Sequence, residues 1–186
     1  ALADSGVEFS SRAWPIVLRP LGPPSTMVLR DPVSSQEVSA LLLALAAYPD
    51  ALELVVEGAL PSRPYLDMTL AVLARFGVQV ERTRDGEREA FLVQGPLRAL
   101  AEPLAIEPDA SLAAIALCAA CLSGGELEAS GVHADSLQGD VRIAEHLRAF
   151  GCRSVFARDG LTASGFPQHG ARIDLSGEPD LAPPLA

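Results

Sequence analysis

Polar side chains that can hold an anion stand at the start of two helical patterns in this chain. Ser34, Ser35 and Gln36 precede one pattern, and Ser62 and Tyr65 open the next. The first turn of a helix offers free backbone N–H groups and the positive end of the helix dipole, so hydroxyls there can build an anion site even in an acidic protein. Spacing alone favours N-capping for the paired serines and an ordinary proline-containing helix start after Ser62.

Two aspartates stand ahead of helical segments later in the chain. Asp109 and Asp180 occupy corresponding places in successive repeats. A carboxylate in such a place caps a helix, and it can also take a proton from a hydroxyl group. Because the place recurs, the pattern alone makes neither aspartate catalytic. Arg63 adds positive charge beside Ser62, although an exposed arginine is usually a solvated side chain.

Cysteine and histidine form no metal or redox pattern. Cys118 and Cys121 have C-x-x-C spacing, but they lie within an apolar run with no second pair and no flanking histidine. We interpret them as packing residues, since free cysteine is among the most buried residue types. His133, His146 and His169 are scattered, so we expect surface or structural roles. The sequence therefore predicts no metal site and no cofactor.

Charge and hydropathy narrow the classes of partner. The net charge of -10 and the pI near 4.7 argue against nucleic acid, because phosphate backbones need clustered positive charge. All 14 basic residues are arginine, so no lysine is present for a Schiff base or for proton transfer. No apolar stretch reaches the roughly 18 to 20 residues that span a bilayer, and the start lacks the features of a signal peptide. We expect a soluble cytoplasmic protein with no membrane partner.

The chain repeats itself at an offset of 74 residues. Residues 71–77 align with residues 145–151, so that Phe76 corresponds to Phe150. Residues 35–43 align with residues 109–117 at the same offset. Two helices therefore recur in the same order and spacing, as expected of a repeated supersecondary unit.

Each repeat is predicted to run strand, helix, strand, helix and then two strands. Amphipathic spacing, polar caps and Asp-Gly turns set the boundaries. The first unit is expected to have strands at 26–29, 52–56, 78–81 and 91–93, and helices after residue 35 and over 63–76. The second is expected to have strands at 104–106, 127–129, 155–156 and 161–163, and helices after residue 109 and over 139–150. Residues 6–9 and 15–21 are typical of the closing strands of an earlier unit, and residues 173–175 and 179–182 of the opening of a later one.

These units divide the chain into four stretches. Residues 1–22 form the tail of a preceding unit, residues 23–100 one unit, residues 101–170 a second unit, and residues 171–186 the start of the next. The chain begins and ends within the pattern, so we interpret it as an excerpt of a longer repeat protein.

Particular motifs carry a resemblance to a known family. They are Ser34-Ser35-Gln36, the segment 62–70 (Ser-Arg-Pro-Tyr-Leu-Asp-Met-Thr-Leu), Asp109-Ala110-Ser111, the segment 135–140 (Asp-Ser-Leu-Gln-Gly-Asp) and the segment 179–182 (Pro-Asp-Leu-Ala). In this order and spacing they resemble the 5-enolpyruvylshikimate-3-phosphate synthase family, also called 3-phosphoshikimate 1-carboxyvinyltransferases. The resemblance spans nearly the whole chain but less than half of the family's usual length.

The resemblance implies a fold and a reaction. The fold is an α/β (α+β) arrangement of βαβαββ units, three to a lobe, in an inside-out barrel with helices inside and sheets outside. The two lobes close on substrate, and the crossing between them is expected near residues 100–107. Residues 23–100 would be the last unit of the first lobe, and residues 101–170 the first unit of the second. The reaction transfers the enolpyruvyl group of phosphoenolpyruvate to the 5-hydroxyl of shikimate 3-phosphate, and the complete protein would be a monomer.

The same resemblance gives roles to the candidate residues. Ser34 and Ser35 would bind substrate, and Gln36 resembles a glutamine that touches both substrates. Ser62 would bind the shikimate phosphate, and Tyr65 would line the shikimate pocket. On the same grounds Asp180 is expected to bind shikimate hydroxyls and assist deprotonation of the attacking oxygen, whereas its repeat counterpart Asp109 would cap a helix.

Departures from the family pattern argue for an incomplete site. The early Lys-Ser and Arg, the glycine-rich Arg segment and the late Glu, Arg and Lys cluster are absent, and Pro184 and Pro108 stand where the family usually has threonine and glycine. We therefore expect weak or no catalysis by this chain alone. Two alternatives stay open: a non-catalytic binding module with only a shikimate 3-phosphate subsite, and the related UDP-N-acetylglucosamine enolpyruvyl transferase, whose sugar-nucleotide site does not use these motifs.

Overall fold

The computed structural model describes residues 7–11, 13–14, 16–20 and 26–186, and contacts divide the chain into two compact units, residues 1–102 and residues 103–186. Each unit is described by itself. Ahead of the first unit's main sheet, β1 (Val7–Phe9) and β2 (Leu18–Pro20) pair antiparallel. They correspond to the strands expected at 6–9 and 15–21, of which residues 6, 15 and 21 lie outside the described part.

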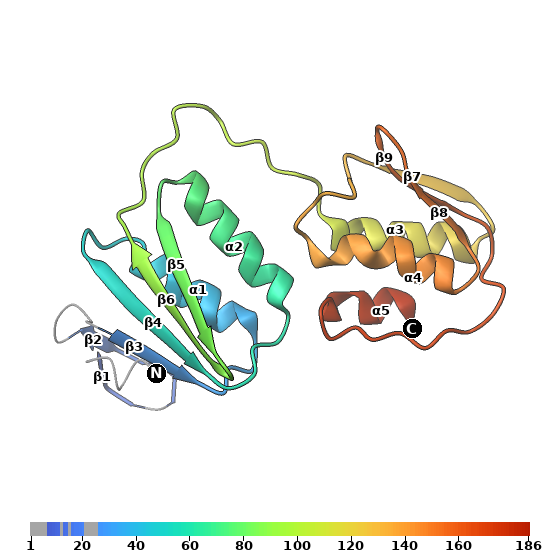
Figure 1. Ribbon diagram of the computed structural model, residues 1–186. Helices are drawn as coiled ribbons and strands as arrows, with labels where there is room; N and C mark the ends of the chain where they lie inside the picture. The colour runs from blue at the N-terminus through green and yellow to red at the C-terminus, as the bar shows by residue number, and fades with distance from the viewer. Residues whose placement is uncertain (1–6, 12, 15, 21–25) are drawn as a thin grey trace. The chain divides into compact units, whose positions relative to one another are not determined.

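The first unit is a four-stranded sheet with two helices on one face (Figure 1). The strands are β3 (Thr26–Arg30), β4 (Ala51–Glu57), β5 (Gln79–Asp85) and β6 (Arg88–Gln94), in the order β3-β4-β6-β5. The helices are α1 (Ser35–Leu45) and α2 (Arg63–Arg75). Strands β3 and β4 are parallel, and the other pairs are antiparallel. The predicted βαβαββ order and the α/β class are confirmed here.

The core of this unit lies between the sheet and the helices. Helices α1 and α2 present apolar side chains at helical spacing, and alternate residues of the strands meet them. Fully buried examples are Val38, Leu42, Leu66, Leu73 and Phe91. Burial of such side chains stabilises by roughly 1.5 to 3 kcal/mol each, so this stripe fixes which face of each helix packs against the sheet.

The second unit repeats the same plan with one strand fewer. It contains α3 (Ala110–Leu122), β7 (Glu126–Ser130), a 3-10 turn η2 (Gly139–Arg142) leading into α4 (Ile143–Ala149), and the hairpin β8 (Arg153–Phe156) and β9 (Gly160–Ser164). The sheet order β7-β9-β8 corresponds to β4-β6-β5 of the first unit. A second 3-10 turn, η3 (Pro179–Leu181), and the short α5 (Ala182–Leu185) follow.

Two predicted strands of this half are wrong. Residues 104–106 and 173–175 are in no strand. A strand needs a partner for its backbone groups, and the described sheet of this unit pairs β7 only with β9, leaving no fourth strand beside it. Pro103 and Pro108 also bracket the first segment, and proline lacks the N–H that a ladder requires.

The cysteines pack as predicted. Cys118, Cys121 and Cys152 are free and buried, and burial raises the pKa of the Cys118 thiol to about 11 and that of Cys121 to about 12. Such thiols are poor nucleophiles and poor metal ligands at neutral pH. Over the described ranges, no helix is both long and apolar enough to cross a membrane.

A buried carboxylate ties α2 to the hairpin of the first unit. The Glu89 side chain is 4% exposed, and its Oε2 accepts a hydrogen bond of 3.0 Å from Nη2 of Arg63 while its Oε1 accepts one from Nε of Arg82. Burial by itself raises the pKa of Glu89, but the hydrogen bonds and charges of Arg82 and Arg63 outweigh it and hold the pKa below its ordinary value. A lowered folded pKa means that the ionised carboxylate stabilises the folded state.

We predict that Glu89→Gln lowers the free energy of unfolding by about 2 kcal/mol at pH 7, because it removes a charge that two arginines share. In the unchanged protein this contribution is complete above pH 4.5, the ordinary pKa, and fades as the pH falls through the lower folded pKa. Urea unfolding from pH 3 to pH 7 should show the two proteins converging at low pH. Glu87→Gln, an exposed change on the same hairpin, is the control and should shift stability by less than about 0.5 kcal/mol; equal effects of both changes would contradict the assignment.

Candidate functional site

The parallel pair β3–β4 places two helix starts at one edge of the first sheet. Parallel strands end at the same edge, and register pairs Arg30 with Glu57 at their last residues. The N–H of Asp31 donates to the carbonyl of Glu57 at 2.7 Å, which holds the two exits together. The segments leaving this edge lead directly into α1 and α2 (Figure 1). The two predicted anion-binding helix starts therefore belong to one end of the unit.

Contacts one to two turns along the helices confirm that their starts are neighbours. The Ser39 and Thr69 hydroxyl oxygens are 2.8 Å apart, which links α1 to α2. At a rise of about 1.5 Å per residue, Ser39 lies about 6 Å along α1 from Ser35, and Thr69 lies about 9 Å along α2 from Arg63. The Thr69 hydroxyl also donates to the Tyr65 carbonyl at 3.0 Å. Sequence reasoning did not single out Ser39 or Thr69, because a tertiary contact between two helices leaves no local signal.

Ser34 is the N-cap of α1, as the spacing predicted. Its Oγ accepts a hydrogen bond of 3.1 Å from the N–H of Gln36. A serine hydroxyl has one hydrogen to donate besides its acceptor lone pairs, so this cap can still donate to an anion. Ser35, the first residue of α1, is buried at 2% exposure, whereas the Gln36 side chain is exposed. Of the three, Gln36 is the most accessible.

Ser62 has a conformation that an ordinary cap does not need. Its φ of 52° and ψ of 49° are left-handed, and its side chain makes no capping hydrogen bond to α2. Left-handed backbone costs a non-glycine residue roughly 1 to 2 kcal/mol. Tyr65, one turn on, is half-buried, and Arg63 between them is held by Glu89 rather than free in solvent. The usual reading of Arg63 as a solvated side chain is therefore wrong.

Asp180 belongs to the second unit. It is the second residue of η3, and the N-cap of η3 is Glu178. The interpretation of Asp180 as a helix N-cap is therefore wrong. The one-turn η3 begins two residues earlier than expected, since Leu181 and Glu178 are both fully buried and fix the turn. Asp180 itself is exposed. Asp109, in contrast, caps α3 as predicted, its Oδ1 accepting from the N–H of Leu112 at 3.0 Å.

A buried carboxylate, that of Glu178, holds the segment that carries Asp180. Oε1 of Glu178 lies 2.8 Å from Nη1 of Arg142 and 2.9 Å from Nε2 of His146, both from the η2–α4 element. His146 is buried, so its predicted structural role is confirmed. Within the described part of the chain, no group of three or more His, Cys, Asp or Glu side chains is arranged to hold a metal ion.

The fold is similar to that of a known enolpyruvyl transferase. The enolpyruvyl transferase NikO from Streptomyces tendae aligns with 88% of this chain and 41% of its own, with a TM-score of 0.56 and 18% sequence identity. At this identity the likeness concerns the fold alone.

Curated relatives are closer in sequence. The 3-phosphoshikimate 1-carboxyvinyltransferase of Pseudoalteromonas translucida (strain TAC 125) is 36% identical over 155 residues, which cover 83% of this chain and 36% of that protein. The protein of the same name from Nitrosomonas europaea is 36% identical over 176 residues, covering 92% of this chain and 39% of that protein. The chain thus spans less than half the length of these relatives.

A family model described as EPSP synthase (3-phosphoshikimate 1-carboxyvinyltransferase) matches residues 9–186, almost the whole chain. Together with the repeat of the fold and the two helix starts at one sheet edge, this match shows that the chain belongs to the EPSP synthase family.

Proposed function

We propose that this chain contributes part of the shikimate 3-phosphate site of an enolpyruvyl transferase, and that the complete protein transfers the enolpyruvyl group of phosphoenolpyruvate to the 5-hydroxyl of that substrate. Ser34, Ser35, Gln36, Ser62 and Tyr65 are the proposed contacts in the first unit. The edge where α1 and α2 start suits a phosphate, because helix dipoles and hydroxyl donors converge on it. Binding of a phosphate by helix dipoles and hydroxyl groups needs no cationic side chain, which fits a chain whose net charge is -10.

The observation that carries the proposal is the contrast between Ser62 and its repeat counterpart. At the offset of 74 residues Ser62 corresponds to Ser136, whose Oγ accepts from the N–H of Gln138 at 3.1 Å. Among the described non-glycine residues only Asp31 and Ser62 have positive φ. Ser136 lies two residues before Gln138, the N-cap of η2, and has no left-handed backbone, so the second repeat does not use the strained conformation of Ser62. Strain kept at a residue whose hydroxyl caps nothing is typical of a ligand-binding position.

Asp180 is the proposed base. The attacking 5-hydroxyl must lose a proton as its oxygen bonds to C2 of phosphoenolpyruvate, while C3 gains one; the tetrahedral adduct then loses phosphate and the C3 proton. An exposed carboxylate on a turn anchored by buried Glu178 can accept the first proton without moving. The chain has no lysine, so a lysine that protonates C3 would have to come from residues outside it.

The two units are proposed to belong to different lobes. Residues 23–100 would be the last unit of one lobe and residues 101–170 the first unit of the other, with the crossing in the segment 100–107. The complete protein is proposed to act as a cytoplasmic monomer. A chain that binds shikimate 3-phosphate without turnover is the second candidate, favoured by the absence of lysine.

Titration calorimetry with shikimate 3-phosphate, run beside a phosphate-release assay with phosphoenolpyruvate, tests the proposal. We expect binding without phosphate release by this chain, because part of the donor set is present and the lysine and arginine motifs of the family pattern are not. Sustained release would show that the missing cationic groups are dispensable. Absence of binding would remove the serine set as a working site.

Ser62→Gly separates strain from binding. Glycine adopts the left-handed region freely, so the relief of strain should offset the added chain entropy and leave the free energy of unfolding within about 0.5 kcal/mol of the original. Affinity for shikimate 3-phosphate should fall about tenfold with the loss of one hydrogen bond to a charged group. Ser136→Gly is the matched control, expected to cost about 1 kcal/mol of stability through the lost hydrogen bond with the N–H of Gln138, without altering affinity; the reverse pattern would refute the assignment.

The two repeat-related aspartates give a second matched pair. Asp109→Ala should lower the free energy of unfolding by about 1 kcal/mol, the usual cost of losing an N-cap, and should leave affinity for shikimate 3-phosphate unchanged. Asp180→Asn should leave stability within about 0.5 kcal/mol, since its side chain is exposed, and should weaken binding several-fold. Chemical denaturation and calorimetry on both variants measure the two effects. Loss of stability in Asp180→Asn with intact affinity would make this aspartate structural.

A further inference from the structure

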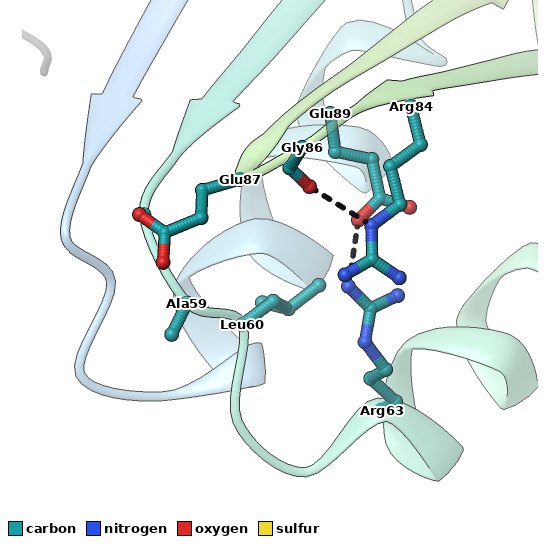
Figure 2. A pocket seen from close by; sticks show the side chains of 8 residues that line it. Ala59, Leu60, Arg63, Arg84, Gly86, Glu87 and Glu89 are labelled. Carbon is teal, nitrogen blue, oxygen red and sulfur yellow. Dashed lines mark hydrogen bonds and ion pairs between the residues drawn. The ribbon is translucent and has the colours of Figure 1, made fainter.

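A polar recess lies beside the start of α2, between the loop after β4 and the β5–β6 hairpin (Figure 2). Its volume is about 190 Å³. Among the described residues, it is lined by Gly58, Ala59, Leu60, Arg63, Arg84, Gly86, Glu87 and Glu89. None of the proposed substrate contacts is in this set, so the recess is separate from the serine site.

Two guanidinium groups meet in this recess. Arg63 comes from the first turn of α2 and Arg84 from β5, and in Figure 2 their guanidinium groups point toward one another. Register explains why Arg84 faces this way: it pairs across the hairpin with Glu89, so both side chains leave the same face of the sheet. The recess therefore contains one guanidinium group from α2 and a second from β5.

Arg84 has no ion pair with a described carboxylate. Both oxygens of Glu89 are taken, by Arg63 and Arg82, and Arg82 also lies 3.3 Å from Asp67. The Nε of Arg84 donates to the carbonyl of Gly86 at 3.2 Å instead. An arginine that lacks an ion pair and faces a second guanidinium group gains from a neighbouring anion, because the like charges repel each other.

Glu87 is the one further carboxylate on the wall. In Figure 2 its side chain extends on the other side of Leu60, away from the two guanidinium groups. It is exposed and therefore screened by solvent. We expect it to weaken an anion site without abolishing it.

We propose that Arg63 and Arg84 form a binding site for a phosphate dianion, as inorganic phosphate or as the terminal group of a small phosphate monoester. Guanidinium groups bind such oxygens with paired, charge-assisted hydrogen bonds. Glu89 orients Arg63, and the Gly86 carbonyl orients Arg84, so both forks are held before the anion arrives. The site does not depend on the enolpyruvyl transfer proposed above.

Calorimetric titration of the chain with inorganic phosphate at constant ionic strength, set by potassium chloride, tests this site. Arg84→Gln should weaken phosphate binding about fivefold or more, as expected for the loss of one partly exposed charge contact. Arg88→Gln is the matched control, because it removes the same charge from the same hairpin but lies outside the recess; it should change affinity less than twofold. Glu87→Gln should tighten binding about twofold.

A parallel titration with methyl phosphate identifies the source of the anion. Equal affinity assigns the site to monoesters, and a clear preference for inorganic phosphate assigns it to the free ion; both support the site. If Arg84→Gln and Arg88→Gln lower the affinity for phosphate equally, the effect reflects only the net charge of the hairpin, and the proposal is overturned. The absence of phosphate binding would overturn it as well.

Shikimate 3-phosphate separates the two proposals. Arg84→Gln should leave its affinity unchanged, because its proposed contacts are elsewhere. If Arg84→Gln weakens phosphate and shikimate 3-phosphate by the same factor, the recess is part of the substrate site and a separate site is excluded. Failure of shikimate 3-phosphate to bind, with phosphate binding intact, would instead count against the proposed function alone.

Discussion

The parallel pairing of β3 with β4 is the constraint on which the proposed site depends. Antiparallel neighbours would send their following helices from opposite edges of the sheet, whereas parallel ones send both from the same edge. The contact between the N–H of Asp31 and the carbonyl of Glu57 keeps the two exits adjacent. Everything proposed for the serine site follows from that edge, because its two motifs, one at residues 34–36 and the other at residues 62–65, lie far apart in sequence.

The second repeat shows what this constraint contributes. It preserves the helices and three strands but has no strand parallel to β7 among its described residues. The start of α3 is satisfied by the chain's own side chains, since Asp109 caps it and Gln138 accepts from the N–H of Ala110 at 2.8 Å. Gln138 also donates to the carbonyl of Pro108 at 2.8 Å, and its own N–H donates to Oγ of Ser136. Donors that already have partners within the chain have little left for a ligand, so the difference between the repeats is chemical as well as topological.

Much of this could be predicted from the sequence, and the failures have physical causes. Amphipathic spacing placed α1, α2 and α3, because burial of an apolar stripe decides helices locally. Strands at 104–106 and 173–175 were inferred from repeat symmetry alone, and they failed because a strand exists only with a hydrogen-bonded neighbour. The left-handed backbone of Ser62 and the pairing of Arg63 with Glu89 could not be predicted, since the first is imposed by a turn between buried elements and the second joins residues that only the fold brings together. The proposed roles in the serine site stay predictions.

The proposed function assigns anion recognition and proton transfer to separate parts of this chain. In the first unit, ion pairs with carboxylates engage Arg30, Arg63 and Arg82. The proposed substrate edge uses backbone dipoles and hydroxyl groups, which orient an anion but exchange no proton at neutral pH. Arginine does not lose its proton in proteins, so even an arginine freed from its partner could not act as the acid. The proposed proton acceptor, Asp180, comes from the second unit instead. The proposal thus separates the groups that would hold a phosphorylated substrate from the group that would exchange a proton with it.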